Sequence, residues 1–211
     1  MADDFSKEKW KYLLHTIAHP ADGYYWIRHR DRGSVCIAIL MVIVFSASFS
    51  ANRLLAGFVV NDTDARTVNS LYELLAVLIL YLLLCVSNWS VTCLMNGEGR
   101  LKDIAIALGY GTVPISISLI LATIVSQVIA DKEQTFYYLP IGIGVVYGLT
   151  MMLIGIKQVH HYSLTKTLVT VLLSFAAFLI LVFLILLLVN LLGSVGGFFR
   201  SIYLEIIFRR Q

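Results

Sequence analysis

Few side chains in this sequence have the types and the spacing that catalysis requires. His160 and His161 come nearest to a metal-binding motif, but no Cys, Asp or Glu lies within ten residues to complete a set of ligands. The sequence has no HExxH, GxSxG, GxGD or Walker A pattern. We therefore expect a protein that is not an enzyme and that binds no metal ion or other cofactor.

Two ionisable residues, Arg53 and Glu73, stand at the ends of apolar stretches, where a charge is costly. They lie on either side of one short loop. We expect them to form an ion pair across that loop, or to reach the membrane interface separately. A role in binding a substrate is the alternative that the sequence leaves open.

The most distinctive polar segment runs from Asn96 to Asp103. Its Asn-Gly pair and second glycine are compatible with φ > 0, so it predicts a tight reversal with Asp103 capping the next helix. The segment also carries both charge signs, which a reversal alone does not need. We therefore predict a surface that binds a partner protein, made of Asn96, Gly97, Glu98, Gly99 and Arg100.

Polar and small residues predict where helices pack closely. Asn88, next to Trp89, lies in a polar stripe of a Leu-rich segment and predicts hydrogen bonds between helices. Gly109 and Pro114 interrupt the following apolar segment, and the proline should kink it.

Gly144 and Gly148 form a GxxxG pair, which allows another helix to approach closely. The sequence leaves open whether these glycines face a helix of the same chain or of a second copy in a homo-oligomer.

The elements that must carry these residues are membrane-spanning helices. The chain is 59% hydrophobic and only 14% charged, which is unlike a soluble domain. Five apolar stretches are near or above the roughly 20 residues that cross a bilayer. The predicted spans are 35–55, 73–94, 104–129, 138–156 and 168–192. The sequence thus predicts an all-α, polytopic transmembrane helix bundle with about five spans.

Amphipathic segments are expected at both termini. Trp10, Leu13 and Ile17 share one helical face, which predicts a short helix that ends at Pro20. Three aromatic residues at 24–26 and the arginines after them predict a segment at headgroup level.

At the other terminus, an apolar stripe predicts an interfacial amphipathic helix. The stripe consists of Phe198, Phe199, Ile202, Tyr203, Ile206 and Ile207. The expected regions are therefore 1–33, cytosolic and juxtamembrane; 34–192, the five-span domain; and 193–211, the C-terminal interfacial helix.

The distribution of positive charge indicates the orientation. Six Lys and Arg residues precede the first span and two lie in each of the loops 95–103 and 157–167, whereas the intervening loops are poorer. The positive-inside rule then predicts a cytosolic N-terminus, an external C-terminus and a first span that is a retained signal anchor. The basic residues form no patch with exposed aromatics, so nucleic acid is not an expected partner.

Three stretches of the chain carry a family resemblance: SNWSVTCLMNGEGRLKDIAIALGYGTVPISI, QVHHYSLTKTLVTVLLSF and, before the first span, HPADGYYWI. They resemble the bacterial branch of the Yip (Ypt-interacting protein) family of five-span membrane proteins. The most specific parts are Asn88-Trp89, the Asn96 to Asp103 turn, and Gly109-Tyr110 with Pro114.

The resemblance implies five spans, a cytosolic N-terminus and no enzyme activity. Eukaryotic members are associated with vesicle trafficking and membrane shaping, whereas many bacterial members occur beside carbohydrate ABC importers. It therefore implies an accessory or adaptor protein of the bacterial cytoplasmic membrane, whose partners are the lipid bilayer and other integral membrane proteins such as ABC permease subunits. The alternatives are a small-solute channel or transporter, suggested by Pro and Gly in the third and fourth spans, and a membrane-shaping protein.

Overall fold

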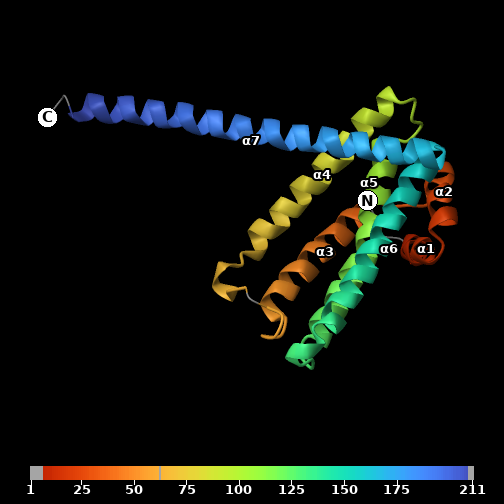
Figure 1. Cartoon of the computed structure of the whole chain (residues 1–211). Coiled ribbons are helices and arrows are strands. Elements are labelled where there is room, and N and C mark those ends of the chain that lie inside the picture. The colour runs from red at the N-terminus through yellow and green to blue at the C-terminus, as the bar shows by residue number, and fades with distance from the viewer. Residues whose placement is uncertain (1–6, 62, 209–211) are drawn as a thin grey trace.

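The computed structural model describes residues 7–61 and 63–208. Within these ranges the chain forms seven α-helices and two short 3-10 turns, with no β-strand (Figure 1). The helices are α1 (Lys7–Ala18), α2 (Pro20–Arg30), α3 (Val35–Leu55), α4 (Ser70–Leu94), α5 (Leu101–Val125), α6 (Thr135–His160) and α7 (Leu164–Phe208), and the 3-10 turns are η2 (Ala65–Thr67) and η3 (Asp131–Glu133).

Five of these helices, α3 to α7, are long and apolar enough to cross a membrane. The prediction of an all-α, multi-pass membrane protein is confirmed. Helix α3 has the predicted bounds, whereas α4, α5 and α6 each begin three residues earlier than predicted. Polar residues open these helices: Asn69, for example, accepts the N–H groups of Leu71 and Tyr72 and so caps α4.

Helix α5 lies at the centre of the bundle, between α3 and α6. A Cβ atom added to Gly109 would lie 2.8 Å from the Cβ of Ala38 on α3. One added to Gly148 on α6 would lie 2.7 Å from the carbonyl oxygen of Gly111. The GxxxG pair, Gly144 and Gly148, therefore faces α5 of the same chain, where the missing side chains let the two backbones meet.

Helix α5 runs without interruption through Pro114. The carbonyl oxygen of this proline lies at the α6 contact, because a Cβ on Gly144 would lie 2.9 Å from it.

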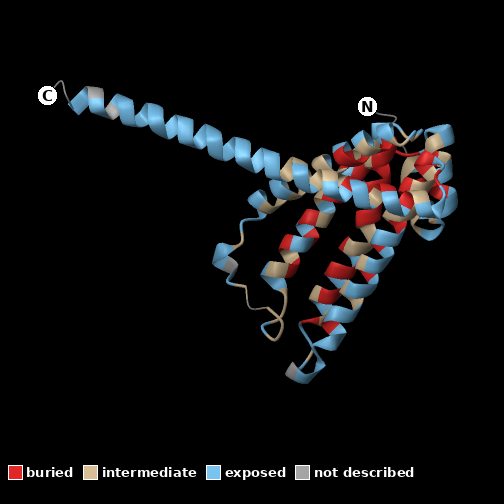
Figure 2. Cartoon of the chain, turned by 45° about the horizontal axis from the view of Figure 1, so that its top comes forward, coloured by how far each residue is buried: buried red, intermediate tan, exposed pale blue. Residues whose placement is uncertain are grey.

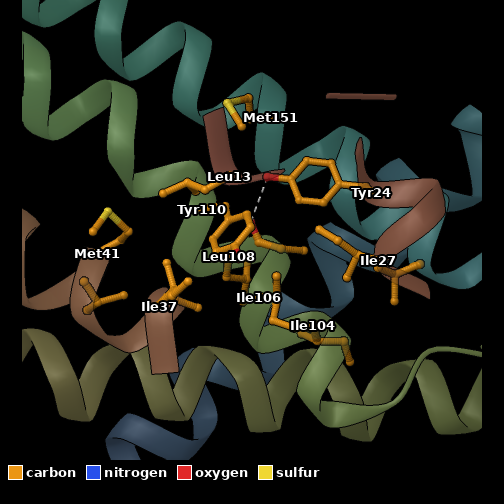
Figure 3. Packing of buried hydrophobic residues seen from close by; sticks show 14 of the residues in the cluster. Leu13, Tyr24, Ile27, Ile37, Met41, Ile104, Ile106, Leu108, Tyr110 and Met151 are labelled. Carbon is orange, nitrogen blue, oxygen red and sulfur yellow. Dashed lines mark hydrogen bonds between the residues drawn. The ribbon is translucent and has the colours of Figure 1, made fainter. Parts of the chain in front are cut away.

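The main hydrophobic core lies at the end of the bundle that carries α1 and α2. Figure 3 shows buried side chains from α1, α2, α3, α5 and α6 in one cluster, among them Leu13, Tyr24, Ile37, Tyr110 and Met151. The described part of region 1–33 therefore packs into the bundle.

Helix α2, which contains residues 24–26, turns one face into the bundle, while its level in a membrane stays a prediction. Tyr24 and Ile27 are fully buried, and the Tyr24 hydroxyl donates a hydrogen bond to the carbonyl oxygen of Ala107 at 3.2 Å. A tyrosine can be buried in this way because its hydroxyl finds an acceptor. Pro20 separates the helices by opening α2 rather than only ending α1.

The loops segregate to two ends of the bundle. At the end with α1 and α2, the turn between α4 and α5 meets the connection between α6 and α7, since the Gly99 N–H donates to Nδ1 of His160. At the opposite end, the Gly57 N–H donates to the Ser126 hydroxyl. This segregation matches the alternation of charged and charge-poor loops, while the orientation in a membrane stays a prediction.

Helix α7 leaves the bundle as a long arm (Figures 1 and 2). It is a single helix of 45 residues, so the separate helix expected after residue 192 does not form. No proline or polar turn interrupts the chain there, and the glycines at 193, 196 and 197 lower helix propensity without ending the helix. Every described side chain from 183 to 203 is exposed.

Candidate functional site

The turn between α4 and α5 lies where four segments of the chain converge. It contacts α2 and the 31–34 connection on one side and the junction of α6 with α7 on the other. We call this place the turn junction, and it comprises Arg28, Asp31, Glu98, Gly99, Arg100, Lys102, Asp103, His160 and Tyr162.

The backbone of the turn reverses at Asn96, which has a φ of 53°. Asparagine tolerates this left-handed region better than most residues. The predicted Asn-Gly pair therefore supplies the reversal through Asn96, whereas no described glycine, Gly97 and Gly99 included, has a positive φ. Space explains these glycines instead: a Cβ on Gly97 would lie 2.6 Å from Nδ1 of His160, and one on Gly99 would lie 2.5 Å from Cγ1 of Val159.

His160 is the residue that sequence reasoning missed. The sequence marks it only as part of an incomplete metal-binding motif, but its side chain is buried, and its Nδ1 accepts the N–H of Gly99 at 3.1 Å. Its ring stacks on Tyr162, whose hydroxyl donates to the carbonyl oxygen of Met95 at 3.1 Å. No local pattern marks this histidine, because the Gly99 N–H that it binds lies about sixty residues earlier in the chain.

Three cations and two carboxylates hold the turn against α2. The Asp103 carboxylate, with 1% of its side chain exposed, accepts from Nε of Arg100 at 2.9 Å and lies 3.9 Å from the Arg28 guanidinium. Asp31 accepts from Arg100 at 2.6 Å and from Lys102 at 2.9 Å. The hydrogen bonds from Lys102 and Arg100 lower the pKa of Asp31, and Asp103 raises the pKa of Arg100. Asp31 and Arg100 are therefore both charged at neutral pH.

This network divides the five residues predicted to bind a partner. Arg100 is engaged within the chain, and Gly97 and Gly99 face His160. Asn96 and Glu98 are exposed, and among the described contacts Glu98 is bound only at its backbone carbonyl, by Arg28 at 2.6 Å. The turn therefore leaves the side chains of Asn96 and Glu98 open to another molecule, whereas Arg100, although exposed, is held by Asp31 and Asp103.

The polar stripe of α4 faces α7 through Asn88. Its amide donates to the Ser174 hydroxyl at 3.1 Å, and both residues are buried. Trp89, in contrast, is 41% exposed, so its expected place in the packing between helices is not observed. Successive helical residues point about 100° apart, which turns Trp89 away when Asn88 faces α7.

At the opposite end of the bundle, the predicted ion pair between Arg53 and Glu73 is confirmed. Ser50 also donates to the Glu73 carboxylate. Among the described residues, no group of three His, Cys, Asp or Glu is placed to hold a metal ion.

Comparison with known proteins places this architecture in a family. The family model described as the Yip1 domain matches residues 14–187, which include the turn junction and reach from α1 into α7. No curated protein and no solved structure matches the chain. Since the match covers most of the sequence, the chain belongs to the Yip1 domain family.

Proposed function

We propose that this protein is a non-enzymatic adaptor that binds another integral membrane protein along α7. One observation carries the proposal: Gly193 and Gly197 form a second GxxxG pair, with no atom within 4 Å of either added Cβ. At the first pair, on α6, helix α5 occupies the space beside the two glycines. A small-residue face on an unpacked helix is suited to the close approach of a helix from another protein.

The length of α7 supports the same proposal. Its apolar part, Leu164–Tyr203, has 40 residues and is therefore about 60 Å long, roughly twice the thickness of a hydrocarbon core. Such a helix must tilt strongly or bend to stay in the membrane. Contact with a neighbouring protein would fix its direction, since its own chain does not do so beyond residue 182.

In a bacterial host, we propose that the partner is a permease subunit of a carbohydrate ABC importer. The support is the association that the family resemblance implies. We place the protein in the cytoplasmic membrane with its N-terminus cytosolic and its C-terminus external, because the loops rich in Lys and Arg lie at the end of the bundle that carries α1 and α2. Asn96 and Glu98 would then form a small cytosolic contact.

Site-specific crosslinking in native membranes tests the proposal. A photoreactive residue at Val195 on α7 should yield a discrete adduct with a membrane protein, identified by mass spectrometry. The matched control places the same residue at Val146, which is 67% exposed on α6 and should give only lipid adducts. Adducts with a second copy of this chain would indicate a homo-oligomer, and lipid adducts alone at both positions would contradict the adaptor role.

Variants then locate the surface. Gly197→Leu should lower recovery of the partner, whereas Gly142→Leu should not, although neither glycine has a neighbour within 4 Å in this chain. Glu98→Ala tests the turn without disturbing the fold, because no described contact uses the Glu98 side chain. Full recovery with Glu98→Ala would remove the turn from the interface and leave the α7 proposal intact.

A further inference from the structure

An open groove of about 780 Å³ lies between α1 and α2. We call it the α1–α2 groove. It is lined by Glu8, Lys9, Lys11, Tyr12, His15, Asp22, Trp26, Arg30, Asp31 and Arg32.

Aromatic rings hold two guanidinium groups at this groove. The Arg30 guanidinium lies 4.6 Å from the centre of the Trp26 ring, and that of Arg32 lies 5.9 Å from Trp26 and 5.7 Å from Tyr12. Among the described residues, neither arginine has a carboxylate partner, and the same holds for Lys11. The rings therefore position the two arginines, and no described carboxylate compensates their charge.

The carboxylates of the groove are largely satisfied by other groups. Asp22 is bound by His15 at 3.0 Å and by the Trp26 indole N–H at 3.1 Å. Asp31 is bound by Lys102 and Arg100, two cations that lie outside the groove. With Glu8 as the third acid against four Lys and Arg, the groove keeps a positive field that favours an anion.

The groove lies beside the start of the first apolar span. Arg32 is two residues before Ser34, the N-cap of α3, whose hydroxyl accepts the N–H of Ile37. Leu14, on the neighbouring helix α1, is 67% exposed. Cations and aromatic rings just before a membrane span, next to an exposed apolar residue, are typical of the depth at which lipid phosphates lie.

We propose that the α1–α2 groove binds the phosphate group of an anionic phospholipid. Arg30 and Arg32 bind the phosphate oxygens by charge-assisted hydrogen bonds, and Lys11 adds a third positive charge. The site does not depend on the α7 adaptor role, since it uses other helices. A soluble phosphate compound has the same chemistry, and the test separates the two sources.

The test uses the full chain in phosphatidylcholine nanodiscs that contain a small fraction of phosphatidylglycerol. Lipids retained on the protein are counted by native mass spectrometry. The double variant Arg30→Gln/Arg32→Gln should weaken the preference for phosphatidylglycerol about 25-fold, and Lys11→Gln about fivefold, taking about fivefold per cation. The control variant Arg66→Gln/Lys132→Gln removes two exposed charges at the opposite end and should keep the preference.

Two results would overturn the proposal. The first is an equal preference for phosphatidylglycerol in the groove variant and the control variant, when thermal unfolding shows that both variants are folded. The second is displacement of phosphatidylglycerol by inorganic phosphate or glycerol phosphate at comparable concentration, which would assign the groove to a soluble anion.

Discussion

At the scale of single residues, the turn junction shows why two glycines stand beside a buried histidine. Gly97 and Gly99 approach the His160 ring so closely that neither has room for a side chain. The ring in turn accepts a backbone N–H from the turn. The glycines and the histidine therefore form one packing unit that joins α4 and α5 to α6.

This unit predicts the effect of adding a single methyl group. Gly99→Ala should lower the free energy of unfolding by about 1 to 3 kcal/mol, because the methyl group meets His160 and Val159. Gly142→Ala, where nothing lies within 4 Å, should be neutral or stabilising by up to about 1 kcal/mol. Thermal unfolding in detergent measures both. In a His160→Ala background the cost of Gly99→Ala should fall, and an unchanged cost would contradict the contact.

The ion pairs of the junction predict a dependence on pH. Lys102 and Arg100 hold the pKa of Asp31 below its ordinary value. The stabilisation is therefore complete above the unfolded pKa of about 4, and it is lost as the pH falls through the lower folded value. The difference in unfolding temperature between the wild type and Asp31→Asn should be constant from pH 7 to about 5 and shrink below about 4. A difference that stays constant to pH 3 would remove Asp31 from the network.

At the scale of elements, the bundle uses one GxxxG pair and leaves another open. Helix α5, which is buried between α3 and α6, occupies the space beside Gly144 and Gly148 on α6. Gly193 and Gly197 on α7 face no part of the described chain. The same motif therefore serves internal packing on α6 and is free for a partner on α7.

The internal pair predicts how a large side chain acts. Gly148→Leu should lower the free energy of unfolding by about 1 to 3 kcal/mol or more, because the side chain would strike Ile115 and the Gly111 carbonyl. Gly142→Leu on the same helix provides the control. The loss should not depend on protein concentration, since both helices belong to one chain. A loss that depended on concentration would place these glycines in an interface between copies.

At the scale of the whole molecule, the segregation of loops makes the orientation testable. A cysteine at Asn61 should react with a membrane-impermeant thiol reagent in intact cells, whereas one at Glu98 should not. Cys36, Cys85 and Cys93 are first replaced by alanine. Glu98 is the suitable position in the turn, because a side chain at Gly97 would strike His160. Labelling at Glu98 and not at Asn61 would reverse the orientation.

The sequence by itself determined the number and places of the spans, the all-α class and the family, and it offered the Arg53–Glu73 ion pair as one of its alternatives. These follow from properties of continuous segments: apolar length, charge at their ends and motifs of neighbouring residues. Helix α3 illustrates how much such local properties determine, since its bounds agree with the prediction.

Only the tertiary structure decided which faces meet. It buried Tyr24 and His160, exposed Trp89, paired Arg100 with Asp31 and placed Gly148 against Gly111. Each of these depends on a contact between residues far apart in the chain or on the direction in which a side chain points. In a chain as apolar as this one, hydrophobicity does not distinguish the faces of a helix that meet protein from those that meet lipid, because both surroundings are apolar.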